Sequence, residues 1–186
     1  MSIFIFLKNV IQLILSPGNA WKDIDRSEAT YEEVVSRGLY PLMAIMLLTV
    51  FVRPLYGLMH FEIINLLQVA LVQFIAVFVA LYVGRYVMSH FLPFYNSTGE
   101  NDPIAVDNVA AYGTGLLVSL QILLNLLPVE HGVLLMLPLV AAVPIWKADK
   151  YLDVEPAGEL KFMLMAVSAL VLPVILINVL MPLLIN

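Results

Sequence analysis

The sequence predicts an all-α fold: a polytopic integral membrane bundle of about five transmembrane helices with an N-terminal interfacial amphipathic helix. The first observation is composition, since 62% of the residues are hydrophobic and only 12% are charged. Soluble domains are nearer ~45–50% apolar and ~25% charged. The second observation is that apolar stretches near membrane-spanning length, which is ~20 residues, fill the chain from residue 39 to residue 185.

The composition also excludes several classes of function. The chain has no cysteine, which rules out disulfides, thiolate metal sites and cysteine nucleophiles. The net charge of -5 is spread over loops, and without a basic patch we expect no nucleic-acid partner. No Ser/His/Asp order, phosphate loop or HExxH motif is present. We therefore expect no enzymatic activity and no cofactor.

Residues 1–37 are predicted to form cytoplasmic or interfacial helices. On a helix over residues 1–15, Lys8, Asn9, Gln12 and Ser16 share one narrow face and apolar residues fill the rest. This pattern is typical of a helix lying on the membrane surface, with Lys8 at the interface. A short buried helix and a cleaved signal peptide remain as alternatives, although the basic n-region and cleavage site of a signal are missing.

Two further helix starts precede the first span. Ser16 followed by Pro17 predicts a short helix that would hold Trp21 and Lys22 at the membrane surface. Thr30 and Glu33 form a capping box for the next helix. Gly38 and Pro41 then mark where the chain enters lipid.

The transmembrane domain is predicted to comprise residues 38–186. Its spans are expected at about residues 39–59, 63–87, 105–127, 132–146 and 161–185. The fourth is short for a span, and it contains Pro138 and Pro144. The fifth contains Pro173 and Pro182, which predict kinks.

The positions of lysine and arginine predict the orientation. These residues cluster before the first span and in the 147–161 loop, and are absent from the 60–62 and 128–131 turns. The positive-inside rule then predicts a cytoplasmic N-terminus and an external C-terminus in the cell membrane, which is the inner membrane in a bacterium. Tyr40, Tyr86, Trp146 and Tyr151 are expected at the cytoplasmic interface.

Small residues recur every four positions in two spans. The second span has Ala76, Ala80 and Gly84, and the third has Ala111, Gly115 and Ser119. Such spacing lets helix backbones approach closely, so we expect these two spans to pack together. The alternative is that small residues are simply common in membrane helices.

That packing would bring Arg85 near Asp107. A charge at this depth is costly unless it is paired or wetted, so we interpret the two residues as an ion pair. The alternative has Arg85 reaching the headgroups and Asp107 capping the third helix.

Polar residues also line one face of the third span, namely Asp107, Thr114, Gln121 and Asn125. This stripe should face the bundle interior or a wet cavity. We interpret these residues as forming hydrogen bonds between helices, and the alternative is that they line a path for a solute or an ion.

Ionisable residues of the outer region suggest two weaker hypotheses. Arg53 is expected in the outer part of the first span, either paired with Glu62 or Glu130 or reaching outward to the surface. His60 and His131 could join those glutamates around a metal, but no ligand spacing supports a metal site.

Three stretches resemble bacterial members of the Yip family, the Ypt/Rab-interacting multi-span proteins. They are SPGNAWKDI at 16–24, LYPLMAIMLL at 39–48 and VDNVAAYGTG at 106–115. The resemblance implies five spans, a cytoplasmic N-terminus and no catalysis or cofactor. The aspartate-leucine-tyrosine-glycine-proline element of the eukaryotic relatives is absent here, so their role in Rab traffic is not carried over.

The expected function is that of a non-catalytic membrane scaffold or membrane-organising protein. Its partners would be the lipid bilayer and either a second copy or another membrane protein. The alternative is a small transporter or channel subunit that uses the polar face of the third span.

Overall fold

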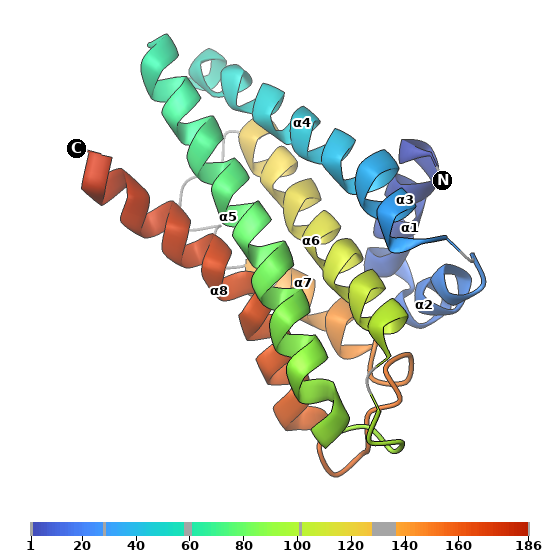
Figure 1. Ribbon diagram of the computed structural model, residues 1–186. Coiled ribbons are helices and arrows are strands. Elements are labelled where there is room, and N and C mark those ends of the chain that lie inside the picture. Colours follow the sequence, from blue (N-terminus) through green and yellow to red (C-terminus); the bar gives the residue numbers. More distant parts are fainter. Residues whose placement is uncertain (1, 28, 58–60, 101, 128–136, 186) are drawn as a thin grey trace.

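The computed structural model describes residues 2–27, 29–57, 61–100, 102–127 and 137–185. Within these ranges every regular element is a helix, which confirms the predicted all-α class. The elements are α1 (Ile3–Leu15), α2 (Pro17–Asp25), α3 (Tyr31–Val34), a π-helical turn (Val35–Leu39), α4 (Tyr40–Thr49), a 3-10 segment (Val50–Tyr56), α5 (Ile63–Phe91), a 3-10 turn (Leu92–Phe94), α6 (Pro103–Leu126), α7 (Leu137–Trp146) and α8 (Glu159–Ile185) (Figure 1).

Capping residues explain where several helices begin. Thr30 precedes α3 and accepts a hydrogen bond from the Glu33 amide at 3.3 Å, as the capping-box pattern predicted. Asp102 caps α6, and its carboxylate accepts from the amides of Ile104 and Ala105. Pro17 opens α2, although the Ser16 hydroxyl makes no capping bond there.

Four helical segments of the described chain are long and apolar enough to cross a membrane. They are residues 31–56, 63–94, 103–126 and 159–180. The first begins at Tyr31, eight residues before the start predicted from the sequence, because α3, the π-helical turn and α4 run on without a break. The predicted boundary at 37/38 therefore lies inside one continuous helical segment.

α6 and α8 run in the same direction through the bundle. Tyr95, which follows α5, contacts Phe162 at the start of α8, and Asn96 bridges to Val154. Arg85 near the end of α5 binds Asp107 near the start of α6. Thus α6 and α8 begin at the same end of the bundle, and the chain must return between them. α7 covers the part of this return nearest that end, and residues 132–136 of the predicted fourth span lie outside the described residues.

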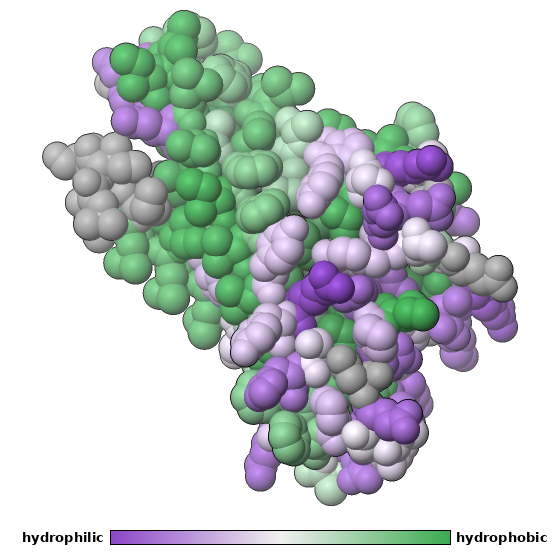
Figure 2. Space-filling view, viewed as in Figure 1, coloured by the Kyte–Doolittle hydropathy of each residue, from purple (hydrophilic) through white to green (hydrophobic). Residues whose placement is uncertain are grey.

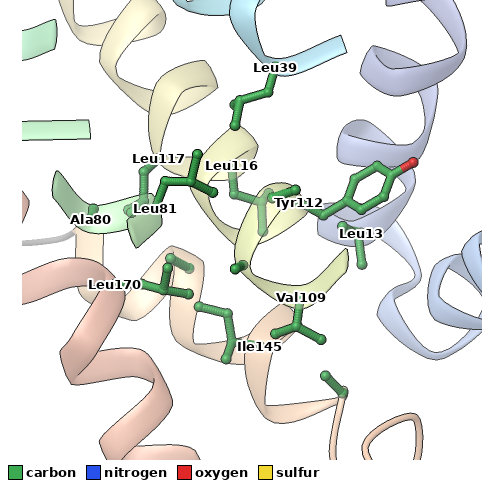
Figure 3. Packing of buried hydrophobic residues seen from close by; sticks show 14 of the residues in the cluster. Leu13, Leu39, Ala80, Leu81, Val109, Tyr112, Leu116, Leu117, Ile145 and Leu170 are labelled. Atoms are coloured by element: carbon green, nitrogen blue, oxygen red, sulfur yellow. The ribbon is translucent and has the colours of Figure 1, made fainter. Parts of the chain in front are cut away.

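α6 runs through the middle of the bundle, with other helices on several sides of it (Figure 1). Its residues Val109, Tyr112 and Leu116 are fully buried. Leu170 of α8 and Ile145 of α7 approach α6 from one side, while Tyr112 points toward α1 on the other (Figure 3). A single hydrophobic cluster therefore joins the N-terminal helices to the spans.

The N-terminal helix differs from the prediction of a helix that simply lies on the membrane. Phe6, Val10 and Leu13 are fully buried against the bundle, whereas Phe4 and Leu15 are 80% and 79% exposed. Asn9, which was assigned to the polar outer face, is buried and donates to the Tyr112 hydroxyl at 3.1 Å. α1 therefore has two apolar faces, and one of them docks on the protein.

Trp21 also differs from its predicted place at the membrane surface. The side chain is only 2% exposed, and its indole nitrogen donates to the carbonyl oxygen of Pro144 at 2.8 Å. Its ring stacks on Tyr151 with centroids 5.4 Å apart. A buried indole needs an acceptor, and the Pro144 carbonyl lies in the last turn of α7, where carbonyls have no partner within their own helix.

The surface divides into an apolar and a polar part. Hydrophobic residues cover the outer stretches of α4 and α5, and hydrophilic residues gather over α2 and the loops that follow α5 and α7 (Figure 2). Highly exposed apolar side chains include Leu48, Leu55, Ile64, Leu71 and Leu176. In water such a surface would be unstable, so it is explained by contact with lipid.

Candidate functional site: polar residues of α6

The ion pair between Arg85 and Asp107 lies where α5 meets the first turns of α6. The Arg85 Nε donates to Asp107 Oδ1 at 2.5 Å and Nη2 donates to Oδ2 at 3.0 Å. The two side chains are 40% and 12% exposed, so the carboxylate is buried and one edge of the guanidinium is not. This is the pairing expected from the sequence, and its bidentate geometry fixes both side chains.

Tyr31 completes the surroundings of this pair. Its ring lies beneath the guanidinium, with the Arg85 Cζ 4.6 Å from the ring centroid. Such a cation–π contact is worth roughly 0.5–1 kcal/mol at exposed sites. The pair therefore also ties α3, at the start of the first span, to α5 and α6.

A second polar cluster joins three helices deeper in the bundle. Asn125 of α6 and Gln73 of α5 exchange two amide hydrogen bonds of 3.0 and 3.1 Å. The Asn125 amide nitrogen also donates to Thr49 of α4 at 3.1 Å. All three residues are buried, so each polar group finds its partner inside the protein rather than in lipid.

Between these clusters the α6 stripe contains polar atoms with no hydrogen-bond partner among the described residues. They are the Thr114 hydroxyl and the Gln121 carbonyl oxygen, on residues that are 0% and 5% exposed. The stripe predicted from the sequence thus faces the interior along its whole length. It makes strong contacts at both ends and leaves two acceptors unused in the middle.

A third set of polar contacts connects α6 to the loop that follows α7. Asn108 donates to the Tyr151 hydroxyl at 2.9 Å. Burial raises the pKa of Tyr151 above its ordinary value, while the Asn108 bond opposes that rise. Tyr151 also stacks on Trp21, so this contact fixes the 147–158 loop against α2.

The small residues take partners that were not predicted. α5 and α6 are neighbours, and Ala76, Ala80 and Ala111 are fully buried. The closest approach at Gly84, however, is made by Leu170 of α8, and that at Gly115 by Phe6 of α1. Ser119 uses its hydroxyl within its own helix, on the carbonyl oxygen of Gly115. The prediction of one seam between the two stripes is therefore wrong at its two glycines.

Arg53 lies half-buried in the 3-10 segment that ends the first span. Its Nε is buried without a hydrogen-bond partner in the described part of the chain. Glu62, one of its expected partners, instead accepts from Asn65 at 2.6 Å. Glu130, the other, lies outside the described residues, as do His60 and His131.

The remaining interface candidates differ in exposure, since Lys8 is exposed and Trp146 is half-buried. Lys8 lies on α1, and Trp146 ends α7 and packs against the core. Within the described ranges no group of three or more His, Cys, Asp or Glu side chains could hold a metal ion.

Two members of the polar clusters were missed in the sequence, Gln73 and Thr49. Gln73 is three residues before Ala76, so it falls outside the four-residue spacing that defined the small-residue pattern. A signal was present nonetheless, because a glutamine in the middle of a 29-residue apolar helix is costly without a partner.

The fold and its buried polar residues define a polytopic helical membrane protein. Comparison with protein-family models, curated proteins and solved structures finds no match.

Proposed function

We propose that this protein is a non-catalytic membrane scaffold or membrane-organising protein that acts through helix and lipid contacts. The observation that supports the proposal is that buried ionisable and amide side chains bond to residues of other helices. Asp107, Asn125 and Gln73 are all consumed in bonds between helices. Such residues hold a bundle together and leave little polar surface for a substrate.

The N-terminal helix supplies the means of acting on lipid. Its inner face is fixed to the bundle through Phe6 and Asn9, and its outer face presents Phe4 and Leu15. An apolar face held at the membrane boundary inserts among the acyl chains of one leaflet and bends it. The Yip resemblance of residues 16–24 and 106–115 supports the same non-enzymatic role.

The experiment reconstitutes the protein in lipid vesicles and images their shape. We expect the wild type to increase vesicle curvature and the double variant Phe4→Ser/Leu15→Ser to lose most of that effect. Leu55→Ser is the matched control, because Leu55 is equally exposed at 81% but lies at the end of the first span. Equal remodelling by all three proteins would contradict the proposal.

A transporter or channel role is the second candidate, and the unpartnered acceptors of Thr114 and Gln121 favour it. They could contact water or a solute inside the bundle. Solute flux into the same vesicles tests this role with Gln121→Leu, which removes the acceptor and keeps the volume similar. Flux that falls in this variant while its thermal stability is unchanged would support the transporter.

A further inference from the structure

Part of the Arg85 guanidinium stays exposed although Asp107 and Tyr31 both contact it. Nε and Nη2 bind Asp107, and the Tyr31 ring covers one face of the plane. The side chain is still 40% exposed, although it is fixed by these contacts. A guanidinium has five N–H donors, and Asp107 and the Tyr31 side chain do not use all of them, so N–H groups on the exposed edge remain for another acceptor.

Tyrosine side chains from three helices surround this edge. Tyr82 of α5 and Tyr31 of α3 both interact electrostatically with Arg85. Tyr40 of α4 lies beside Tyr82 within the same group. Tyr40 and Tyr82 are 43% and 44% exposed, close to the 40% exposure of the Arg85 side chain.

The depth of this group indicates what those surroundings are. Arg85 lies near the end of the 63–94 span, and the exposed aromatic residues Tyr86 and Phe94 follow it. Tyrosine is typical of the headgroup level of a bilayer, where its ring is in the apolar region and its hydroxyl is wet. A guanidinium at this level lies among lipid phosphates.

We propose that Arg85, Tyr40 and Tyr82 form a binding site for the phosphate group of a phospholipid in the leaflet next to the N-terminal helices. The site deepens the membrane-organising function proposed above and rests on it for the presence of lipid. The guanidinium donates through its exposed edge to phosphate oxygens, and the hydrogen-bonded pair of phenols donates its remaining O–H to the same group. Asp107 orients the guanidinium and offsets its charge, so the site recognises phosphate by hydrogen bonds at short range.

The test measures lipid binding to the detergent-purified full chain by native mass spectrometry. The probes are phosphatidylglycerol, diacylglycerol with the same acyl chains, and inorganic phosphate. We expect phosphatidylglycerol to bind, diacylglycerol to bind at least about tenfold more weakly, and millimolar inorganic phosphate to leave lipid binding unchanged. Displacement of the lipid by inorganic phosphate would overturn the assignment to a lipid.

The decisive variant is Tyr40→Phe/Tyr82→Phe, which removes two hydroxyl groups and leaves the Arg85–Asp107 pair intact. We expect about three- to tenfold weaker phosphatidylglycerol binding, as for the loss of one or two hydrogen bonds. Tyr86→Phe is the matched control, because Tyr86 is 70% exposed one position along the same helix. Arg85→Lys, which keeps the charge without the planar fork, should weaken binding about tenfold if it remains folded.

Two results would overturn the proposal. One is unchanged binding in Tyr40→Phe/Tyr82→Phe, and the other is an equal loss in Tyr86→Phe. Failure of the lipid site is distinguishable from failure of the scaffold role, since vesicle remodelling depends on Phe4 and Leu15 of α1. Selective lipid binding without remodelling would leave the site in place and refute the scaffold.

Discussion

Several polar side chains of this protein lie wholly or partly inside the bundle, and the free-energy cost of burying each one depends on its partners. Asp107 is paired with Arg85, and Asn125 with Gln73 and Thr49. In lipid the alternative to each bond is an unsatisfied group, so the partners keep one another inside the bundle.

The ion pair predicts a measurable coupling. Asp107→Ala should lower the free energy of unfolding by about 1–2 kcal/mol, a value discounted because the Arg85 side chain is partly solvated. The loss should shrink when Arg85 has already been changed to Met, because no guanidinium is then left without its carboxylate. A double-mutant cycle in detergent, followed by thermal or denaturant unfolding, measures this coupling. Additive losses would show that the two side chains do not depend on each other.

Tyr151 predicts a dependence on alkaline pH. Burial raises its pKa above the ordinary value of 10.0, so the folded state holds the phenol proton more tightly than the unfolded state. The stability that this provides is complete below pH 10.0 and is lost as the pH rises through the folded-state pKa.

Unfolding of wild type and Tyr151→Phe between pH 8 and pH 11 measures that loss. We expect the variant to be less stable at pH 8 by about 1 kcal/mol, because it lacks the bond from Asn108. The difference in free energy of unfolding between the wild type and this variant should narrow as the pH rises. Tyr86→Phe, at an exposed position, should leave the wild-type profile unchanged, and a constant gap for Tyr151→Phe would contradict the prediction.

At the scale of helices, the positions of the spans could be predicted from the sequence, but most of their contacts could not. Span length and apolar content are local properties, and four of the five predicted spans match described helices. The Arg85–Asp107 pair was predictable because few charges occur at that depth. Leu170 on Gly84 was not, because many leucines of the chain could equally have filled that gap.

The docking of α1 shows the same limit. Phe6, Val10 and Leu13 face inward, while Phe4 and Leu15 face outward, and all five residues are apolar. Hydropathy cannot distinguish an apolar face that meets protein from one that meets lipid. The polar signal was misleading as well, because Asn9 turns toward Tyr112 rather than away from the bundle.

The contact between α5 and α8 predicts the effect of a methyl group at Gly84. A Cβ added there would clash with Leu170 Cδ2 and lie 2.9 Å from its Cγ, so the Leu170 side chain or α8 must shift. Gly84→Ala should therefore destabilise the protein by about 1–3 kcal/mol, and Leu170→Ala should partly restore the double variant. Gly18→Ala is the control, because nothing lies within 4 Å of its added Cβ. Equal stability of Gly84→Ala and wild type would show that the helices do not approach this closely.

The polar cluster of three helices gives a prediction of its own. Asn125→Ala removes bonds to α4 and α5 at once and leaves Gln73 without its partner. We expect a loss of about 1–2 kcal/mol, since hydrogen bonds between membrane helices average roughly 0.6 kcal/mol each. Unfolding in mixed micelles measures it, and Asn178→Ala serves as the control because Asn178 bonds within its own helix.

At the scale of the whole molecule, charge separates the two ends of the bundle. Of the nine lysine and arginine residues, Arg53 belongs to the end of the first span. The others lie on the N-terminal helices, at the junction of α5 with α6, and around the loop before α8. This asymmetry is the basis for proposing a cytoplasmic N-terminus and an external C-terminus.

The most direct measurement uses the fact that the chain has no cysteine. Single cysteines replacing Ser27, Thr98, Glu155 or Phe61, each at an exposed position, can be labelled with a membrane-impermeant maleimide in intact cells and after lysis. The proposed arrangement predicts labelling of the first three only after lysis, and of the Phe61 substitution in intact cells. Labelling of Phe61→Cys and Thr98→Cys from the same side would contradict it, because α5 would then not cross the membrane.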